Sequence, residues 1–496
     1  MSKKRPNILI TFSDDQPYYD ISGLGNTEIR TPVQERMMER GTCFERVYHG
    51  GSTTGAVCCP SRAQLFTGMP VMQIPNVMKN WWEDDADKFE APNPDPACMP
   101  LLGEELRKSG YYCYGTGKWH NFPFSYIRNF NDGGAIYFCG GNPLQDRLKK
   151  MPHMPYGKYG SPRPDEVGRG GHFNKPLHVY DGTGEYSPFL SYTEPRHSTD
   201  AFSESAIHFL DNYKDDKPFF LYVAFTAPHG PMKTYQSWHD QYPADKVSLP
   251  PNFTPCHAWD NGGFLTKERL DSGFAYTEEE SRESIADLYA ITAHEDEAIG
   301  QIQDALERNG FADNTIVIHT GDHGKSLGHH GLQGKYSLYE HSIAVPLLMY
   351  GPGIPKGEVR HQLAYQHDLF PFILEQAGLE IPETTGYDSI GPLVQDGDNP
   401  GREYIGTLFK DTQRMIRDRR WKLIAYHVNG EKHIQLFDME KDPHELENLA
   451  GQADKTETID RLLDAMRDWQ KKMGDPFDVA PANAAEAKPS PDFRQK

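Results

Sequence analysis

Short apolar runs that end in polar residues limit the possible folds of this chain more than any other feature. Four of them are clear: NILITF, YYCYGTG, FFLYVAFTAP and NTIVIHTG. Continuous runs of Val, Ile, Leu and Phe are typical of parallel strands that are buried on both faces. Each run leads into Asp, Lys or His side chains, and α/β enzymes bind ligands at the carboxyl ends of such strands. The pattern therefore predicts a sheet with a polar site along one edge.

Amphipathic segments separate these runs. The clearest covers residues 283–310, where Ile285, Leu288, Ile299 and Ile302 recur near helical spacing. Strands that alternate with helices predict an α/β fold, in which helices cover both faces of a large, mostly parallel central sheet.

A change of pattern toward the C-terminus predicts a second, smaller unit of the α+β class with a short antiparallel sheet. The pair Asn429-Gly430 is typical of a hairpin turn in that sheet, and a helix is expected over 455–473. We therefore divide the chain into three segments: a catalytic domain at 1–400, a C-terminal subdomain at 401–475 and a loose tail at 476–496.

The charge balance excludes nucleic acid as the main partner. With 51 basic and 71 acidic residues the formal net charge is −20, and no basic run offsets it. No stretch has the roughly 18 apolar residues of a membrane span. The apolar run at 8–12 is too short for a signal peptide, so we expect a cytoplasmic protein, or a periplasmic or secreted one if a signal has been removed. Seven cysteines, an odd and sparse number, do not predict a disulfide framework.

The segment AVCCPSRAQLFTG (56–68) places two adjacent cysteines at a predicted helix start. Pro60 suits the first turn, where its missing N–H needs no partner, and Gly68 favours termination. Cys58 would then lie at the positive end of the helix dipole, where a thiolate or a bound anion is stabilised. The alternative interpretation is that Cys58 and Cys59 are two small buried apolar residues.

Together these segments resemble the formylglycine-dependent sulfatases of the alkaline phosphatase superfamily. The blocks that carry the resemblance occur in the family's order over most of the chain: PNILITFSDDQ, CCPSRAQLFTG, GTGKWH, TAPHGP, TGDHGKSLGHHGLQGKYSLYEHSIAVPLLM and LFDMEKDPHELENLA. The resemblance implies an alkaline-phosphatase-like fold and hydrolysis of a sulfate ester on a sulfated sugar or oligosaccharide.

In that family the cysteine at the position of Cys58 is converted to formylglycine, an aldehyde, by a separate maturation enzyme, and the resemblance implies the same here. One hydroxyl of the hydrated aldehyde attacks sulfur and becomes sulfated. The other hydroxyl then loses its proton, so that the carbonyl re-forms and sulfate leaves. Cys59 would be a small apolar neighbour at the variable position of the motif.

A sulfate held beside an oxygen nucleophile needs a counterion, so we expect a divalent cation. The candidate ligands follow two strand ends, and an oxygen of modified Cys58 would join them: Asp14, Asp15, Asp322 and His323. The resemblance implies Ca²⁺, with Mg²⁺ as the alternative, although imidazole suits calcium less well than an oxygen donor. Paired Asp residues at strand ends can also cap helices.

The resemblance implies catalytic roles for five further residues. Arg62 would hydrogen-bond the hydrate with its fixed set of donors. Lys118 would bridge nucleophile and sulfate, and His120 would take the proton during sulfate release. His229 would bind sulfate and protonate the leaving alcohol, and Lys335 would hold a second sulfate oxygen.

Residues 121–198 are rich in Gly, Pro, Tyr and Arg and predict long loops over the sheet. We expect these loops to determine the substrate, with Arg169 and His172 as its polar contacts. The sequence after GKWH departs from the family here, so substrate contacts cannot be transferred. Structural roles are expected for four histidines near the candidate site: His319, His329, His330 and His341.

Two other functions are compatible with the sequence. A phosphonate monoester or phosphodiester hydrolase would use the same aldehyde nucleophile and metal site. A glycan-binding pseudoenzyme would result if Cys58 were not matured, although the sequence lacks neither nucleophile nor metal ligand. Rates on aryl sulfate and aryl phosphonate distinguish the first of these from a sulfatase.

Overall fold

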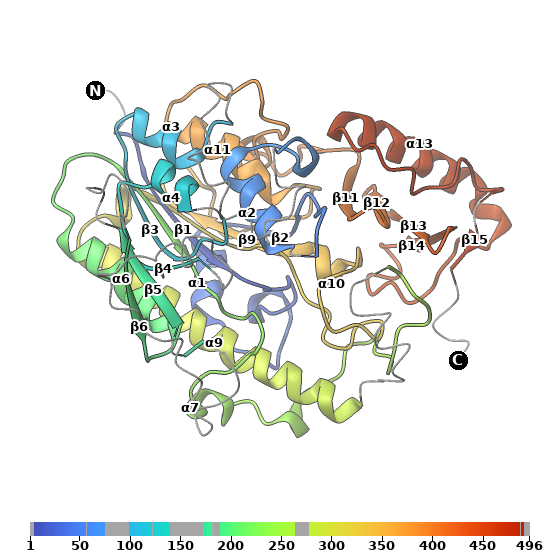
Figure 1. The fold of residues 1–496 in the computed structure, drawn as a ribbon, viewed down its shortest axis with the longest axis horizontal. Helices are drawn as coiled ribbons and strands as arrows, with labels where there is room; N and C mark the ends of the chain where they lie inside the picture. Colours follow the sequence, from blue (N-terminus) through green and yellow to red (C-terminus); the bar gives the residue numbers. More distant parts are fainter. Residues whose placement is uncertain are drawn as a thin grey trace, which may run out of the picture.

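Two β-sheets organise the chain. The structure is a computed structural model, and it describes residues 4–55, 57–74, 99–121, 123–138, 172–173, 175–180, 182, 189–262, 277–486 and 488–490. One sheet has ten strands and the other has five. Figure 1 shows the larger sheet between its helices and the smaller, C-terminal sheet beside it.

The apolar runs of the sequence form the middle of the large sheet, whose order is β10-β2-β9-β8-β1-β7-β3-β4-β5-β6. They are β1 (Asn7–Ser13), β3 (Tyr112–Lys118), β7 (Phe219–Ala224) and β8 (Thr315–Gly321). These four strands are parallel, with Ile8 of β1 opposite Phe220 and Ile316. Their carboxyl ends therefore share one edge of the sheet, and the predicted fold is confirmed.

Six outer strands complete this sheet: β2 (Thr42–Tyr48), β4 (Asp132–Tyr137), β5 (Lys175–Tyr180), β6 (Phe189–Glu194), β9 (Ala344–Tyr350) and β10 (Glu358–Arg360). Of the described strands, only β5 and β9 run against the others. Strands β4, β5 and β6 correct the expectation that residues 121–198 form loops alone. Gly in β4 and Pro in β5 concealed those two strands, because both residues are tolerated near the margin of a sheet.

Helices cover both faces of the large sheet (Figure 1). One face carries α2 (Cys58–Thr67), α3 (Leu102–Lys108), α4 (Pro123–Asn129) and α11 (Leu369–Gln376), and the other α1 (Pro32–Arg40), α6 (Ser198–Asn212) and α9 (Glu278–Arg308). Alternate residues of β1 reach the two layers, since Ile8 and Ile10 join one apolar cluster and Leu9 the other. None of the described helices is long and apolar enough to cross a membrane.

Capping residues set the start of α9 and the end of α2. The predicted helix at 283–310 is α9, and it starts earlier because Thr277 and Glu280 form a capping box. Helix α2 ends at Gly68 in the left-handed conformation, as predicted. The other α-helices in the described part of the large domain are short: α7 (Gln236–His239), α10 (Glu340–Ile343) and α12 (Gly391–Gln395).

The C-terminal unit is a sheet with a helix on one face. Its elements are β11 (Ile405–Phe409), β12 (Gln413–Arg417), β13 (Trp421–Val428), β14 (Glu431–Asp438), α13 (Thr456–Met473) and β15 (Lys488–Pro489). The hairpin at Asn429-Gly430 joins β13 to β14, and the predicted helix is α13. One face of the sheet packs on α13 and the other on the large domain. Residues 488–489 pair with β14, so this part of the expected loose tail is docked.

Candidate active site

The expected catalytic and metal-binding residues meet at the carboxyl edge of the large sheet. Asp14 directly follows β1, Lys118 is the last residue of β3, and Asp322 follows β8. Cys58 comes from a different direction, as the first residue of α2. All four side chains are buried. The parallel strand ends thus bring together residues that lie more than 300 positions apart in the chain.

The Cys58 thiol lies between cationic groups. Lys335 Nζ donates to Cys58 Sγ at 2.9 Å, and His323 Nε2 lies 3.1 Å from the same sulfur. Burial and the Asp14 carboxylate act to raise the pKa of the thiol, but Lys118 and Lys335 outweigh them and hold it well below its ordinary value. An anion or a polar nucleophile is therefore stabilised at this position.

Cys59 has different surroundings although it is the next residue. Its Sγ lies 3.7 Å from the amide oxygen of Asn121, on a side chain that is also buried. Successive residues of an α-helix point in directions about 100° apart, so the two thiols face different parts of the molecule.

Arg62 fixes the start of α2 to the ends of two strands. Its Nε and Nη2 donate to Asp322 Oδ2 at 3.2 and 3.0 Å, and its Nη1 donates to the Lys118 carbonyl at 2.9 Å. The guanidinium is fully buried and lies 4.9 Å from the Phe12 ring centroid. Arg62 thus positions Cys58 against β3 and β8 in this structure.

Each carboxylate of this edge has a cationic partner: Asp14 has Lys118, Asp15 has Lys335 and Asp322 has Arg62. Burial acts to raise the pKa values of Asp14 and Asp15, yet the neighbouring lysines hold both well below the ordinary range. Burial dominates at Asp322 and raises its pKa to about 6. At neutral pH the three groups are therefore carboxylates.

Four of these side chains could hold a metal ion. Ligand atoms of Asp14, Asp15, Cys58 and His323 all lie within 4.8 Å of one another. His323 Nδ1 donates to the Gly324 carbonyl at 2.9 Å, which leaves the lone pair of Nε2 for the group. Asp14 Oδ1 is buried and has no hydrogen-bond partner among the described residues. A divalent cation fits this set of oxygen and nitrogen donors.

Two histidines border the same edge. His229 follows β7, is half-buried, and donates from Nδ1 to the Gly230 carbonyl at 2.7 Å, so Nε2 is its remaining acceptor. His120 follows β3 in a left-handed conformation with φ of 55° and is also half-buried. Both lie where strands that carry the catalytic residues end.

The two expected substrate contacts have different outcomes. Arg169 lies outside the described residues. His172 is buried, with Nδ1 at 2.9 Å from Thr226 Oγ1 and Nε2 at 2.9 Å from the His229 carbonyl oxygen. Because both ring nitrogens are engaged, His172 supports the segment that carries His229. Sequence could not show this, since its partners lie more than 50 positions away. The expected contact of His172 with substrate stays a prediction.

Two residues of this region escaped the sequence interpretation. Lys325 donates from Nζ to Asp15 Oδ2 at 3.2 Å. The sequence feature that could have identified Lys325 is its position two residues after His323, at the same strand end. Glu295 of α9 accepts from Ser13 Oγ at 2.6 Å behind the carboxylates, and burial raises its pKa well above the ordinary range. No sequence pattern distinguishes Glu295 from other polar residues of that helix.

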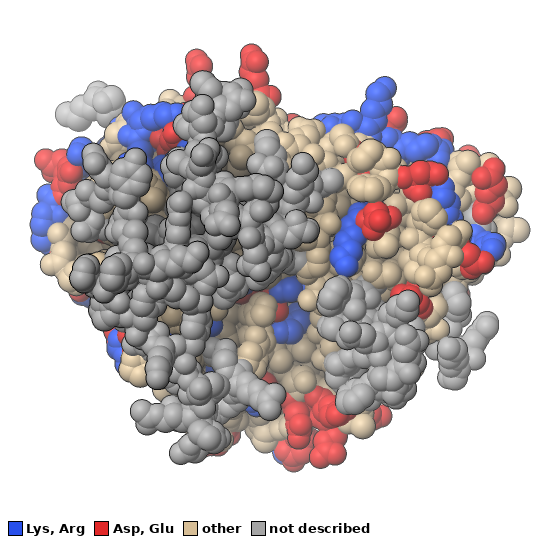
Figure 2. Space-filling model, viewed as in Figure 1, with Lys and Arg blue, Asp and Glu red and all other residues tan. Residues whose placement is uncertain are grey.

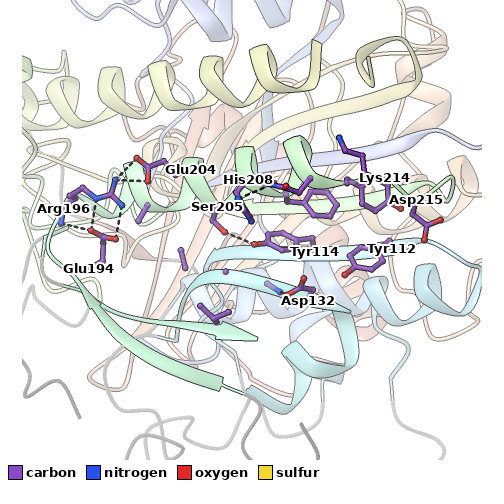
Figure 3. A pocket seen from close by; sticks show the side chains of 18 residues that line it. Tyr112, Tyr114, Asp132, Glu194, Arg196, Glu204, Ser205, His208, Lys214 and Asp215 are labelled. Carbon is purple, nitrogen blue, oxygen red and sulfur yellow. Dashed lines mark hydrogen bonds and ion pairs between the residues drawn. The ribbon is translucent and has the colours of Figure 1, made fainter. Parts of the chain in front are cut away.

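A separate cavity of about 680 Å³ opens between α6 and the sheet (Figure 3). Its wall includes the rings of Tyr112 and Tyr114, and Arg196 bridges Glu194 and Glu204 at its rim. None of the predicted site residues lines it. The strand-end site is therefore distinct from this cavity.

Comparison with protein families agrees with the site's composition. A model of the sulfatase family matches residues 6–379, and a model described as N-sulphoglucosamine sulphohydrolase, C-terminal, matches residues 328–472. The chain belongs to the sulfatase family. This sulfatase is 28% identical to arylsulfatase K of Danio rerio, over 94% of the chain and 85% of the relative. It is 27% identical to an arylsulfatase of Clostridium perfringens, over 92% and 93%.

Solved structures share the fold of this sulfatase. A putative sulfatase, yidJ, from Bacteroides fragilis has a TM-score of 0.72 and 21% identity, with 98% of this chain and 99% of that chain covered. The protein BT4656, described in complex with its substrate D-glucosamine-2-N,6-O-disulfate, has a TM-score of 0.73 and 21% identity, with 95% and 99% covered. The predictions of a sulfatase fold and a sulfatase enzyme are confirmed.

Proposed function

We propose that this sulfatase removes sulfate from a sulfated carbohydrate, with formylglycine made from Cys58 as its nucleophile. The observation that carries the proposal is the position of Cys58 at the start of α2, in one group with Asp14, Asp15 and His323. A carbohydrate substrate is supported by N-acetylglucosamine-6-O-sulfatase of Bacteroides thetaiotaomicron, which is 25% identical over 95% of this chain and 87% of the relative.

The side chains around Cys58 would have two kinds of role: lysines would bind the sulfate group, and histidines would transfer protons. Lys335, which contacts Cys58 Sγ, and Lys118, which contacts Asp14, would bind sulfate oxygens as charge develops on them. His120 would accept a proton from the sulfated intermediate. His229, with Nδ1 held by the Gly230 carbonyl, would present a protonated Nε2 to the leaving alcohol oxygen.

The carboxylate edge would hold a divalent cation, with Ca²⁺ proposed and Mg²⁺ as the alternative. Asp14, Asp15, Asp322 and His323 would be its ligands, together with an oxygen of modified Cys58. Such an ion supplies positive charge that lets an anionic sulfate approach an oxygen nucleophile. Three carboxylates and one imidazole suit a hard cation such as Ca²⁺ or Mg²⁺. Zinc in structural sites prefers ligand sets that are rich in thiolates.

The test begins with the chain produced together with a formylglycine-generating enzyme. Mass spectrometry of the peptide that contains Cys58 should show conversion of the thiol to the aldehyde. The converted enzyme should release sulfate from sulfated sugars and aryl sulfates much faster than it cleaves aryl phosphonates. Faster cleavage of the phosphonate would favour the hydrolase alternative, and sulfate release from fully unconverted chain would overturn the assignment of the nucleophile.

A further inference from the structure

Lys325 adds a cation that the proposed steps do not use. Its Nζ donates to Asp15 Oδ2 at 3.2 Å, and its side chain is 10% exposed. Tyr19 donates to the backbone carbonyl of Lys325 at 2.8 Å, which anchors the segment. The ammonium is thus held against the catalytic carboxylates and still reaches the surface of the site.

The charge on the carboxylate edge is already balanced without Lys325. Asp15 Oδ1 accepts from Lys335 at 2.7 Å, and the other two carboxylates each have their own cation. Lys325 is therefore a fourth cation beside three carboxylates in the described part of the site. Asp20, a further buried acidic group near Lys325, has its pKa raised well above the ordinary range by burial, which favours its uncharged form. A divalent ion would increase the positive charge, whereas a sulfate monoester brings a single negative charge. The site can accommodate a second anionic group.

The position of Lys325 shows on which side that group would lie. A Cβ atom placed on Gly230 would be 3.5 Å from Lys325 Nζ, and Gly230 directly follows His229. His229 is the residue proposed to protonate the leaving alcohol. Lys335, in contrast, contacts the nucleophile residue. Lys335 therefore serves the side of the attacking group, and Lys325 borders the side of the sugar. Figure 2 shows a small group of Lys and Arg atoms near the middle of the face in view.

We infer that Lys325 binds a second anionic group of the sugar, a carboxylate or a further sulfate, next to the sulfate ester that is cleaved. This inference rests on the proposed function and narrows its substrate class to sugars with at least two anionic groups. An ammonium is a compact charge with rotatable donors, so it accepts either anion. A hydrogen bond to a charged group is worth about 1.5–3 kcal/mol, which corresponds to roughly 10–150-fold in binding.

The experiment compares the converted wild-type enzyme with Lys325→Gln and Lys325→Arg on three substrates. They are a neutral sugar with one sulfate, a disaccharide with one sulfate and a uronate carboxylate, and a sugar with two sulfates. We expect Lys325→Gln to lose at least about tenfold more kcat/KM on the two dianionic substrates than on the neutral sugar, mainly through KM. Lys325→Arg should restore most of the difference. The exposed Lys246→Gln, with the same change of charge, should show no such difference.

A binding measurement makes the test independent of turnover. In the Cys58→Ala background, calorimetry should show that Lys325→Gln weakens binding of a dianionic substrate about tenfold or more, and less so in high salt. Equal losses on all three substrates would overturn the inference and place Lys325 on the reacting sulfate. A preference for only one dianionic sugar would identify the anion. If the wild-type enzyme releases sulfate from none of them, the proposed function fails, and the calorimetry still decides whether Lys325 binds the second anion.

Discussion

Two buried groups of side chains in this molecule have the composition of a metal site, but their surroundings differ. The catalytic cluster comprises Asp14, Asp15, Cys58 and His323, and the histidine cluster comprises His330, His341 and Glu445. The first lies at strand ends that also carry the expected catalytic residues. The second lies where the C-terminal sheet packs on the large domain.

The histidine cluster is largely satisfied by the chain itself. Lys422 Nζ lies 2.7 Å from Glu445 Oε1, and the backbone N–H of Glu340 donates to Glu445 Oε2 at 2.9 Å. Asn252 Nδ2 lies 2.9 Å from His330 Nε2. His341 Nε2, however, has no hydrogen-bond partner in the described part of the chain. This cluster has a single carboxylate, Glu445, so it offers a metal ion less negative charge than the catalytic cluster does.

The comparison teaches that ligand-type residues alone do not define a metal site. The catalytic cluster combines several carboxylates with an unpartnered oxygen, Asp14 Oδ1, and borders half-buried His229. The histidine cluster has one carboxylate and joins two parts of the fold. The first arrangement is suited to a bound ion and the second to holding the domains together. The following predictions test that distinction.

The largest expected effect is loss of activity in the catalytic cluster. Cys58→Ala should lower kcat/KM for a sulfate ester by at least about 10³-fold, because the covalent step is removed. Cys59→Ala is the control, and it should retain activity within about tenfold because its thiol lies beside the amide oxygen of Asn121. Steady-state kinetics on one aryl sulfate checks both. A reversed order of the two variants would show that the nucleophile is misassigned.

The next largest expected effect is on bound metal, which should be lost from a variant of the catalytic cluster but not from a variant of the histidine cluster. Asp14→Asn should lose the bound ion and about 10²–10³-fold in activity, since the nucleophile and sulfate then face each other without a counterion. Glu445→Gln should keep the same metal content as wild type. Elemental analysis of dialysed protein gives both values. Loss of one metal equivalent in Glu445→Gln would show that the histidine cluster is a second metal site.

A change at Asn252 should affect stability rather than chemistry. Its Oδ1 accepts from His329 Nδ1 at 2.7 Å, and its Nδ2 donates to the His444 carbonyl at 2.9 Å. Asn252→Ala leaves these buried groups unpaired and should lower the free energy of unfolding by about 1–3 kcal/mol. Denaturant unfolding measures this change. A fall in kcat/KM with unchanged stability would instead connect the histidine cluster to the active site.

The smallest expected effect is on how the free energy of unfolding changes as the pH falls. Burial holds the pKa of His341 well below its ordinary value, so the unfolded chain binds a proton below about pH 6.5 that the folded chain excludes. This contribution to stability is present above pH 6.5 and is lost as the pH falls. His341→Gln should therefore flatten the decline of unfolding free energy between pH 7 and 5, by at most about 2 kcal/mol. An unchanged slope would mean that the His341 imidazole does not exclude the proton.

The central sheet could be predicted because its strands are continuous apolar runs, as in residues 7–12. The outer strands could not, since a segment such as KPLHVY has no strong pattern and depends on its neighbours for pairing. The predicted site residues share strand ends, and a topology of parallel strands makes them converge. His172 shows the limit of this reasoning, because its role depends on contacts with Thr226 and His229 that no local pattern specifies.

The order of strands in the large sheet also determines when, during synthesis of the chain, the surroundings of Cys58 can form. β1 lies between β7 and β8, so the pocket around Cys58 closes only after β8 is made, roughly 260 residues later. At synthesis rates of about 5–20 residues per second this delay is roughly 13–50 s. Cys58 is 2% exposed once folded. If a separate enzyme converts Cys58, as proposed above, that enzyme competes with folding for a limited interval. The yield of active protein would then depend on which process is faster.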